Sequence, residues 1–136
     1  MERTFAIIKP DAVEAKNAGK IIDLIEKNGF NIVRMEKKQL SLKQAQEFYA
    51  VHKERPFFGE MTSFIASGPV VAMALEKNDA IKAWRDLMGA TDPKKAEAHT
   101  IRALYATDIG KNAVHGSDAP ETAAVELAYF FPDLKK

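Results

Sequence analysis

His115 stands in a local setting that could support chemistry on phosphorus. It lies in the run NAVHGSD, residues 112–118, between a short apolar step and a helix start. Gly116 permits a tight bend and leaves room beside the imidazole. Ser117 and Asp118 are residue types that satisfy free N–H groups at a helix start, where anions are also favoured. The alternative is a hydrogen-bonded histidine at a strand edge with no catalytic role. The local pattern leaves both interpretations open.

Glu126 follows Asp118 by two helical turns. If that helix packs back on the strand, the carboxylate can hydrogen-bond one imidazole nitrogen, fixing the tautomer and leaving the other nitrogen free. A solvated surface acid is the alternative for Glu126. Neutral imidazole, with an ordinary pKa of about 6.5, can attack phosphorus at pH 7 without first losing a proton. This arrangement is typical of a nucleophilic histidine.

Phosphoryl transfer also needs positive charge around the moving group. Lys9 ends an apolar run against Pro10, Arg85 follows Trp84, and Arg102 lies beside Thr100. For each of the three taken singly, an ordinary surface charge is the favoured alternative. The sequence has no G-x-x-x-x-G-K-[ST] loop and no G-x-G-x-x-G after a strand, and its histidines lack metal-ligand spacing. A nucleotide site would therefore not use the usual glycine-rich loops.

The elements that must position these residues alternate along the chain. Apolar patterns predict strands at 3–9, 30–40, 69–77 and 112–117. Helical spacing and caps predict helices at 18–29, from Ser41 with Gln44 as a capping box, at 55–68 from Pro56, at 78–89 and at 118–131. In the last helix we expect Asp118 as the cap, Glu121 completing a box, and an apolar stripe of Ala124, Leu127, Ala128 and Phe131.

With the inserted helices set aside, this order is βαββαβ plus a terminal helix. It predicts an α+β fold, a ferredoxin-like sandwich in which helices surround a four-stranded, mainly antiparallel sheet and pack on one face of it. Residues 90–111 show little regular pattern and at most a turn or two of helix. A loop of this length is commonly functional or disordered. We favour function because Ile101, Leu104, Tyr105 and Ile109 offer apolar anchors.

Composition excludes several classes. The 136 residues predict one domain, 1–136, and 46% hydrophobic content is that of an ordinary globular protein. A net charge of +1 argues against specific nucleic-acid binding and against attraction to acidic membranes. The absence of cysteine excludes disulfides, zinc fingers and thiol catalysis. With no signal-peptide pattern and no membrane-length apolar run, we expect a cytoplasmic protein.

NAVHGSD resembles the N-x-x-H-G-S-D signature of the nucleoside diphosphate kinases. The similarity extends over nearly the full length, in several separate motifs in the right order. They are FAIIKPDAV, FYAVHKERPFF, SGPVVAMALE, RDLMGATDP, TIRALYA and ETAAVELAYFF.

The resemblance implies transfer of the terminal phosphoryl group from a nucleoside triphosphate, with ATP as donor, to a nucleoside diphosphate. His115 would be phosphorylated on Nδ1 in a ping-pong cycle, with broad base and sugar tolerance. Glu126 would orient the imidazole and Ser117 would hold the turn. Lys9 would contact the ribose 3′-hydroxyl and the transferring phosphate, with Tyr49 supporting it.

The remaining implied contacts form the nucleotide site. Asn112 would bind the sugar, and Phe57 would stack on the base opposite Ile109. The phosphates would be contacted by His52, Arg85, Thr91 and Arg102. Mg²⁺ would arrive on the phosphates, so no dedicated carboxylate cage is expected.

The chain departs from the family pattern at His99, Leu104 and Lys111, which concerns the loop and subunit contacts rather than the proposed catalytic groups. It ends soon after Phe131, which indicates a short bacterial-type enzyme and a homo-oligomer, with a tetramer favoured over a dimer. The alternative function is a ferredoxin-like nucleic-acid or regulatory binding module without catalysis.

Overall fold

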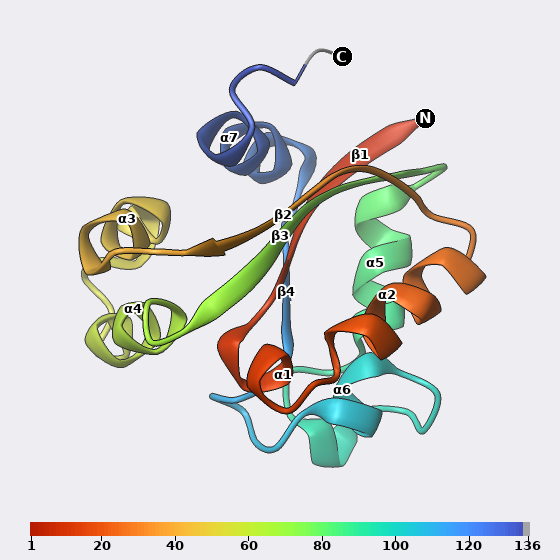
Figure 1. Cartoon of the computed structure of the whole chain (residues 1–136), viewed down its shortest axis with the longest axis horizontal. Coiled ribbons are helices and arrows are strands. Elements are labelled where there is room, and N and C mark those ends of the chain that lie inside the picture. The colour runs from red at the N-terminus through yellow and green to blue at the C-terminus, as the bar shows by residue number, and fades with distance from the viewer. Residues whose placement is uncertain (135–136) are drawn as a thin grey trace.

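The computed structural model describes residues 1–134, and within them four strands form one antiparallel sheet (Figure 1). The strands are β1 (Glu2–Ile8), β2 (Asn31–Gln39), β3 (Pro69–Lys77) and β4 (Val114–Gly116), in the spatial order β2-β3-β1-β4. This confirms the ferredoxin-like arrangement. The short fourth strand pairs with β1 so that His115 lies opposite Ile7.

Helices cover both faces of the sheet, so the expectation of helices on one face was wrong. One face carries α1 (Pro10–Glu14), α2 (Ala18–Lys27), α5 (Ala80–Met88) and α6 (Ile101–Tyr105). The other carries α3 (Leu42–Phe48), α4 (Phe58–Ile65) and α7 (Pro120–Phe130). The physical reason is visible in β1, where Phe5 and Ile7 enter one core while Ala6 and Ile8 enter the other. A strand buried on both faces reads as a continuous apolar run.

Helix starts show where local signals were sufficient. The capping box of Ser41 and Gln44 is present at α3, as predicted. Helix α4 begins at Phe58 rather than at Pro56. Helix α1 was not foreseen, because Pro10 was interpreted only as the end of the strand, whereas proline is also favoured in the first turn of a helix.

The start of α7 differs from the prediction. Its N-cap residue is Ala119, and no side chain caps it, so the roles expected for Asp118 and Glu121 were wrong. The side chain of Ser117 turns instead to Glu126. The carbonyl of Asp118 accepts a hydrogen bond from Arg85, which ties this turn to α5.

The buried face of α7 is also rotated from the predicted stripe. Of the predicted stripe, Phe131 is buried and Leu127 packs against the core, but Ala124 and Ala128 are exposed. The buried residues within the helix are Ala123, Glu126 and Phe130. The pattern of apolar residues did not predict the buried face correctly, because the acidic residue Glu126 points into the protein. This rotation brings Glu126 toward β4.

Between α5 and β4 the chain forms only the 3₁₀ turn Pro93–Lys95 and the short α6, as the weak pattern predicted; a second 3₁₀ turn, Ala50–His52, follows α3. Ile101 is fully buried and anchors the segment, but Leu104 and Ile109 are exposed and do not. No helix in residues 1–134 combines the length and apolarity that a membrane crossing would require.

Candidate active site

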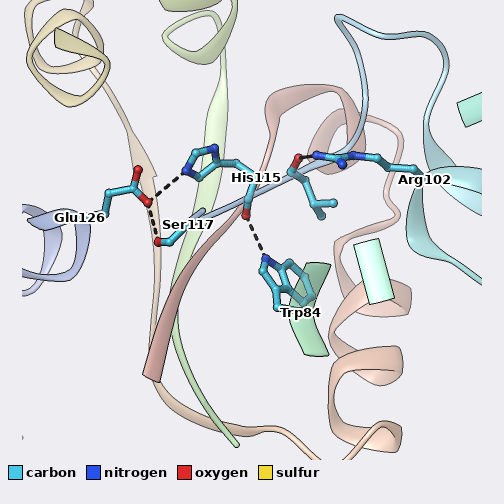
Figure 2. A network of polar contacts seen from close by, with 6 residues as sticks. Trp84, Arg102, His115, Ser117 and Glu126 are labelled. Atoms are coloured by element: carbon cyan, nitrogen blue, oxygen red, sulfur yellow. Dashed lines mark hydrogen bonds and ion pairs between the residues drawn. The ribbon is translucent and has the colours of Figure 1, made fainter. Parts of the chain in front are cut away.

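The His115 imidazole is held by α7. Its Nε2 atom lies 3.2 Å from Oε1 of Glu126, and the Ser117 hydroxyl donates to the same oxygen at 2.7 Å (Figure 2). Ser117 and Glu126 are buried, and His115 is partly buried. Because a carboxylate only accepts hydrogen bonds, Nε2 of the neutral ring carries the proton and Nδ1 keeps its lone pair. The sequence-predicted contact between Glu126 and the imidazole is therefore present.

The backbone of His115 is fixed from the opposite face of the sheet. The indole Nε1 of Trp84, in α5, donates to the carbonyl of His115 at 3.2 Å. The rings of Phe48 and Tyr49 lie edge-on to the imidazole, with centroids 5.4 and 5.8 Å away. The side chain and the main chain of His115 are thus held independently.

Gly116 makes room for Trp84, not for the imidazole as the sequence had indicated. A Cβ at this position would lie 2.4 Å from Cδ1 of Trp84 and 2.8 Å from Cε of Met88. The Trp84 indole is fully buried, so it has no free space to move into. Glycine is required here by the close approach of α5.

Replacing Gly116 with alanine is therefore expected to destabilise the fold by about 1–3 kcal/mol through overpacking. Displacement of Trp84 also weakens its bond to the His115 carbonyl, so kcat falls with stability. Urea denaturation and steady-state kinetics measure the two effects. Gly19→Ala in α2, where an added Cβ meets nothing within 4 Å, is the matched control. Equal stability of the two variants would contradict the packing argument.

Arg102 is buried and joins three backbone carbonyls. Its guanidinium donates to Gly89 at 3.0 Å, to Val114 at 2.9 Å and to Asn112 at 3.3 Å. Burial lowers the pKa of Arg102. The side chain thus ties the end of α5 to the start of β4, and it carries its positive charge close to the site.

Arg85 is exposed, in contrast to the buried Arg102. One of its nitrogens donates to the carbonyl of Asp118 at 2.8 Å. Trp84 and Arg85, adjacent in α5, therefore contact the chain at His115 and again three residues later. Helix α5 is therefore hydrogen-bonded to the chain both within β4 and just after it.

Lys9 follows β1 and reaches the turn before His115. Its Nζ donates to Oδ1 of Asn112 at 2.8 Å. Burial, followed by the charge of Arg102, lowers the pKa of Lys9 to about 8, against an opposing effect of Asp11. The ammonium is thus a cation in a poorly solvated place, which favours interaction with an anion.

A cleft of about 680 Å³ lies beside these groups. Six residues predicted for the site are among those that line it: Lys9, Tyr49, Phe57, Thr91, Ile109 and Asn112. The other six do not line it: His52, Arg85, Arg102, His115, Ser117 and Glu126. His115 is joined to the cleft through Tyr49, whose ring it touches edge-on.

The outer part of the cleft carries exposed apolar side chains. Phe57 is 46% exposed and Ile109 is 60% exposed, although both are large and apolar. The 107–112 segment is shaped by Asp108, whose carboxylate accepts the N–H groups of Gly110 and Lys111 at 2.9 and 2.8 Å. One oxygen of this carboxylate is thus occupied by two backbone donors.

His52 lies between two aromatic rings of the site. Its ring centroid is 6.3 Å from those of Tyr49 and Phe57, and its buried Nδ1 has no hydrogen-bond partner in residues 1–134. Burial, and then the charge of Glu126, raise the pKa of Tyr49. Tyr49 therefore remains a neutral phenol in the physiological range.

Sequence reasoning missed two groups that hold the site. Trp84 was assigned to a helix face, and nothing local shows that its N–H serves a carbonyl 31 residues later. Asp11, in the KPDA segment, accepts the backbone N–H of Ala113 at 3.1 Å. An acidic residue directly after Lys9-Pro10 was the available signal for that contact.

The geometry agrees with what comparison with known proteins finds. A family described as "Nucleoside diphosphate kinase" matches residues 2–135. A protein of that description from Pelobacter propionicus is 60% identical over 135 residues, which are 99% of this chain and 98% of the relative. One from Thiobacillus denitrificans is 61% identical over 132 residues, covering 97% and 93% of the two chains.

Solved structures agree in fold. The nucleoside diphosphate kinase of Aquifex aeolicus superposes with a TM-score of 0.94 at 47% identity, covering 96% of this chain and 94% of its own. A halophilic nucleoside diphosphate kinase from Halobacterium salinarum, solved in complex with CDP, gives a TM-score of 0.92 at 42% identity, covering 97% and 88%. The chain therefore belongs to the nucleoside diphosphate kinase family, enzymes that transfer a phosphoryl group between nucleoside tri- and diphosphates.

Proposed function

We propose that this enzyme works by a ping-pong cycle in which Nδ1 of His115 carries the phosphoryl group between two nucleotides. The observation that carries the proposal is the bond from Nε2 of His115 to Glu126, because it leaves Nδ1 as the free nucleophilic nitrogen. Ser117 shares the carboxylate oxygen and so limits the positions open to Glu126.

The chemistry balances without an external base. The Nδ1 lone pair attacks the γ-phosphorus of a nucleoside triphosphate, and the bond from phosphorus to the β,γ-bridging oxygen breaks. The nucleoside diphosphate leaves with that oxygen, and the proton on Nε2 remains directed at Glu126. In the second half, a terminal oxygen of the acceptor diphosphate attacks phosphorus and the N–P bond breaks, which restores neutral His115.

The cationic groups would stabilise charge on the moving phosphoryl group. Lys9 would contact the ribose 3′-hydroxyl and this group from the floor of the cleft, with Tyr49 beside it. Arg85, Arg102, His52 and Thr91 would contact the other phosphate oxygens. Charge-assisted contacts of this kind are the main protein contribution to phosphoryl transfer, since the transition state requires little covalent help.

The base and sugar would occupy the outer cleft. Phe57 would stack on the base opposite Ile109, and Asn112 would bind a sugar hydroxyl. The exposed apolar surface of Phe57 and Ile109 supports this placement. Stacking tolerates every base because each has a π-face, which explains broad nucleotide tolerance. ATP is the expected donor.

Mg²⁺ would enter as part of the nucleotide substrate. Residues 1–134 contain no group of three His, Asp or Glu side chains that could hold a metal, and Asp108 in the cleft already accepts two backbone N–H groups. The donor set therefore fits an ion carried on phosphates and water. Bound in this way, Mg²⁺ would neutralise charge on the phosphates.

Other expectations from the sequence remain predictions. They are a single catalytic domain spanning residues 1–136, a homo-oligomer with a tetramer favoured over a dimer, and a cytoplasmic location. Membership in an enzyme family leaves the alternative of a binding module without catalysis unsupported.

The pKa of Lys9 gives a pH prediction. Above about pH 8 the free enzyme loses the Lys9 proton, and with it the cation that faces the phosphates. We expect kcat/KM, which reports ionisations of the free enzyme, to fall with one proton through about pH 8. In Lys9→Arg this alkaline fall should disappear, at a lower plateau, because guanidinium stays charged. A wild-type profile that stays flat well above pH 8 would contradict the lowered pKa of Lys9. An alkaline fall that persists in Lys9→Arg would show that another group titrates.

Isotope exchange tests the ping-pong cycle. The enzyme is mixed with ATP, labelled ADP and Mg²⁺, with no second nucleotide pair present. A phosphoenzyme intermediate predicts label moving from ADP into ATP, and parallel lines in double-reciprocal plots with ATP and GDP. Intersecting lines, indicating a ternary complex, would overturn the proposal.

A further inference from the structure

The peptide two residues before His115 has an unusual conformation. Ala113 is fully buried and has φ of 72°, in the left-handed region that side chains with a Cβ disfavour. The N–H of Val114 donates to the carbonyl of Asn112 at 2.8 Å, which closes a three-residue turn around Ala113. Such γ-turns with positive φ are rare and strained, so surrounding contacts must hold this one.

Two contacts from one short segment hold the turn. The carboxylate of Asp11 accepts the N–H of Ala113 at 3.1 Å, and the N–H of Lys9 donates to the carbonyl of Ala113 at 2.8 Å. The segment Lys9–Asp11 thus forms hydrogen bonds with both the N–H and the carbonyl of Ala113. Burial raises the pKa of Asp11, whereas the Ala113 N–H and Lys9 lower it.

The turn determines where the nucleotide-facing groups point. Asn112 is buried, and its side chain accepts a hydrogen bond from Lys9 Nζ while its carbonyl accepts one from Arg102. If the Ala113 peptide relaxed, Asn112 would rotate away from Lys9. The groups that line the cleft floor would then lose their mutual orientation.

We propose that Asp11 is a positioning residue that fixes the strained turn at Ala113 and thereby aligns Lys9 and Asn112 for the nucleotide. Asp11 acts through the backbone and does not touch the substrate. The inference rests on the proposed site at His115 and the cleft, and it adds a residue that this function did not include.

The proposal separates Asp11 from the nucleophile. His115 is held by Glu126 and Trp84, whereas the hydrogen bond from Asp11 goes to Ala113. Loss of Asp11 should therefore impair phosphorylation by a nucleotide more than phosphorylation by phosphoramidate, which has no sugar and keeps only the contact of Lys9 with the moving phosphoryl group. In that reaction Nδ1 attacks phosphorus, the P–N bond of phosphoramidate breaks, and ammonia leaves.

The experiment measures the rate of His115 phosphorylation by ATP and by phosphoramidate in several variants. Asp11→Ala should slow the ATP reaction about 100-fold, and the phosphoramidate reaction, which loses only the Lys9 contact, by less than about tenfold. Asp11→Asn, whose amide oxygen still accepts the Ala113 N–H, should stay within about fivefold of wild type with both donors. Asp11→Ala with Ala113→Gly should recover about tenfold, because glycine adopts positive φ without strain.

A matched control removes another carboxylate with the same structural task. Glu2, at the start of β1, accepts the backbone N–H of Ile81, in the first turn of α5, at 2.9 Å. Glu2→Ala should lower stability without changing either phosphorylation rate. If Asp11→Ala is recovered unfolded, Asp11→Ser, which places its hydroxyl short of the Ala113 N–H, is measured in its place and should show the same donor split.

The outcomes are distinguishable. Equal losses with both donors, or no loss with ATP, would overturn the role of Asp11. A loss in Asp11→Asn as large as in Asp11→Ala would show that the charge beside Lys9 matters, rather than the bond to Ala113, and would also overturn it. Failure of wild-type enzyme to form phosphohistidine with either donor would instead refute the proposed function.

Discussion

Replacement of His115 by alanine should lower kcat by about 10⁴-fold or more, because it removes the group that carries the phosphoryl intermediate. The neighbouring hydroxyls cannot substitute, because Tyr49 is a buried neutral phenol whose pKa is raised and Ser117 donates to Glu126. Stability should fall by only about 1 kcal/mol, since the bond between Ser117 and Glu126 remains. Steady-state kinetics and urea denaturation measure the two quantities.

His99 provides the matched control for this substitution. It is a loop histidine with a side chain 71% exposed, and its nearest charged partner is Glu97 at 3.8 Å. His99→Ala should leave kcat unchanged, even though His99 departs from the family pattern. A His115→Ala enzyme within tenfold of wild type would contradict the role given to His115.

Substitution of Arg102 and of Arg85 by alanine should have different effects on stability. Arg102→Ala removes three hydrogen bonds to carbonyls and should cost about 2–4 kcal/mol of stability, as well as activity. Arg85→Ala removes one exposed bond, so its stability cost should be below about 1 kcal/mol. Loss of a charge-assisted phosphate contact should still lower kcat/KM by about 2–4 kcal/mol, or about 30- to 900-fold, in each variant.

Chemical denaturation and kcat/KM measured on the same samples distinguish these roles. Wild-type kcat/KM in Arg85→Ala would remove Arg85 from the phosphate site. Arg102→Ala with wild-type stability would contradict the tie between α5 and β4. If Arg102→Ala loses stability but keeps kcat/KM at a temperature where it is folded, Arg102 is structural only.

Local patterns predicted much of the strand framework. Strand β3 has the predicted bounds, and β1 and β2 differ from theirs by one residue at each end. These strands are apolar or alternating runs bounded by proline, glycine or polar residues, which are short-range signals. What the runs could not show was which helices cover each face, because a strand buried on both sides looks the same whatever packs on it.

The start and orientation of α7 needed tertiary information. Asp118 has the residue type of a cap, but Ala119 takes that position and the Asp118 carbonyl pairs with Arg85. Spacing allowed Glu126 to reach His115, since two helical turns bring it back over the strand, but it left a solvated surface acid as the alternative. Glu126 lies on the buried face of α7, although an acidic residue is expected on the exposed face. Its hydrogen bonds to His115 and Ser117 compensate for the cost of burying the carboxylate.

Contacts between distant segments were beyond sequence reasoning. Gly116 could be identified as a site of close approach, but not that Trp84 makes the approach. The bond from Asp11 to Ala113 spans 102 positions and depends on a strained turn that no local pattern marks. Residue types therefore indicated the chemistry, whereas the supports of the site required the fold.

Direct labelling of the enzyme tests the central claim most sharply. Wild-type protein and His115→Ala are incubated with γ-labelled ATP and Mg²⁺, separated from nucleotide, and then offered GDP. The account predicts label on wild type only, stable to base, labile to acid, located by phosphorus NMR on Nδ1, and discharged by GDP to give labelled GTP. Label retained in His115→Ala, or wild-type label that GDP cannot discharge, would contradict it.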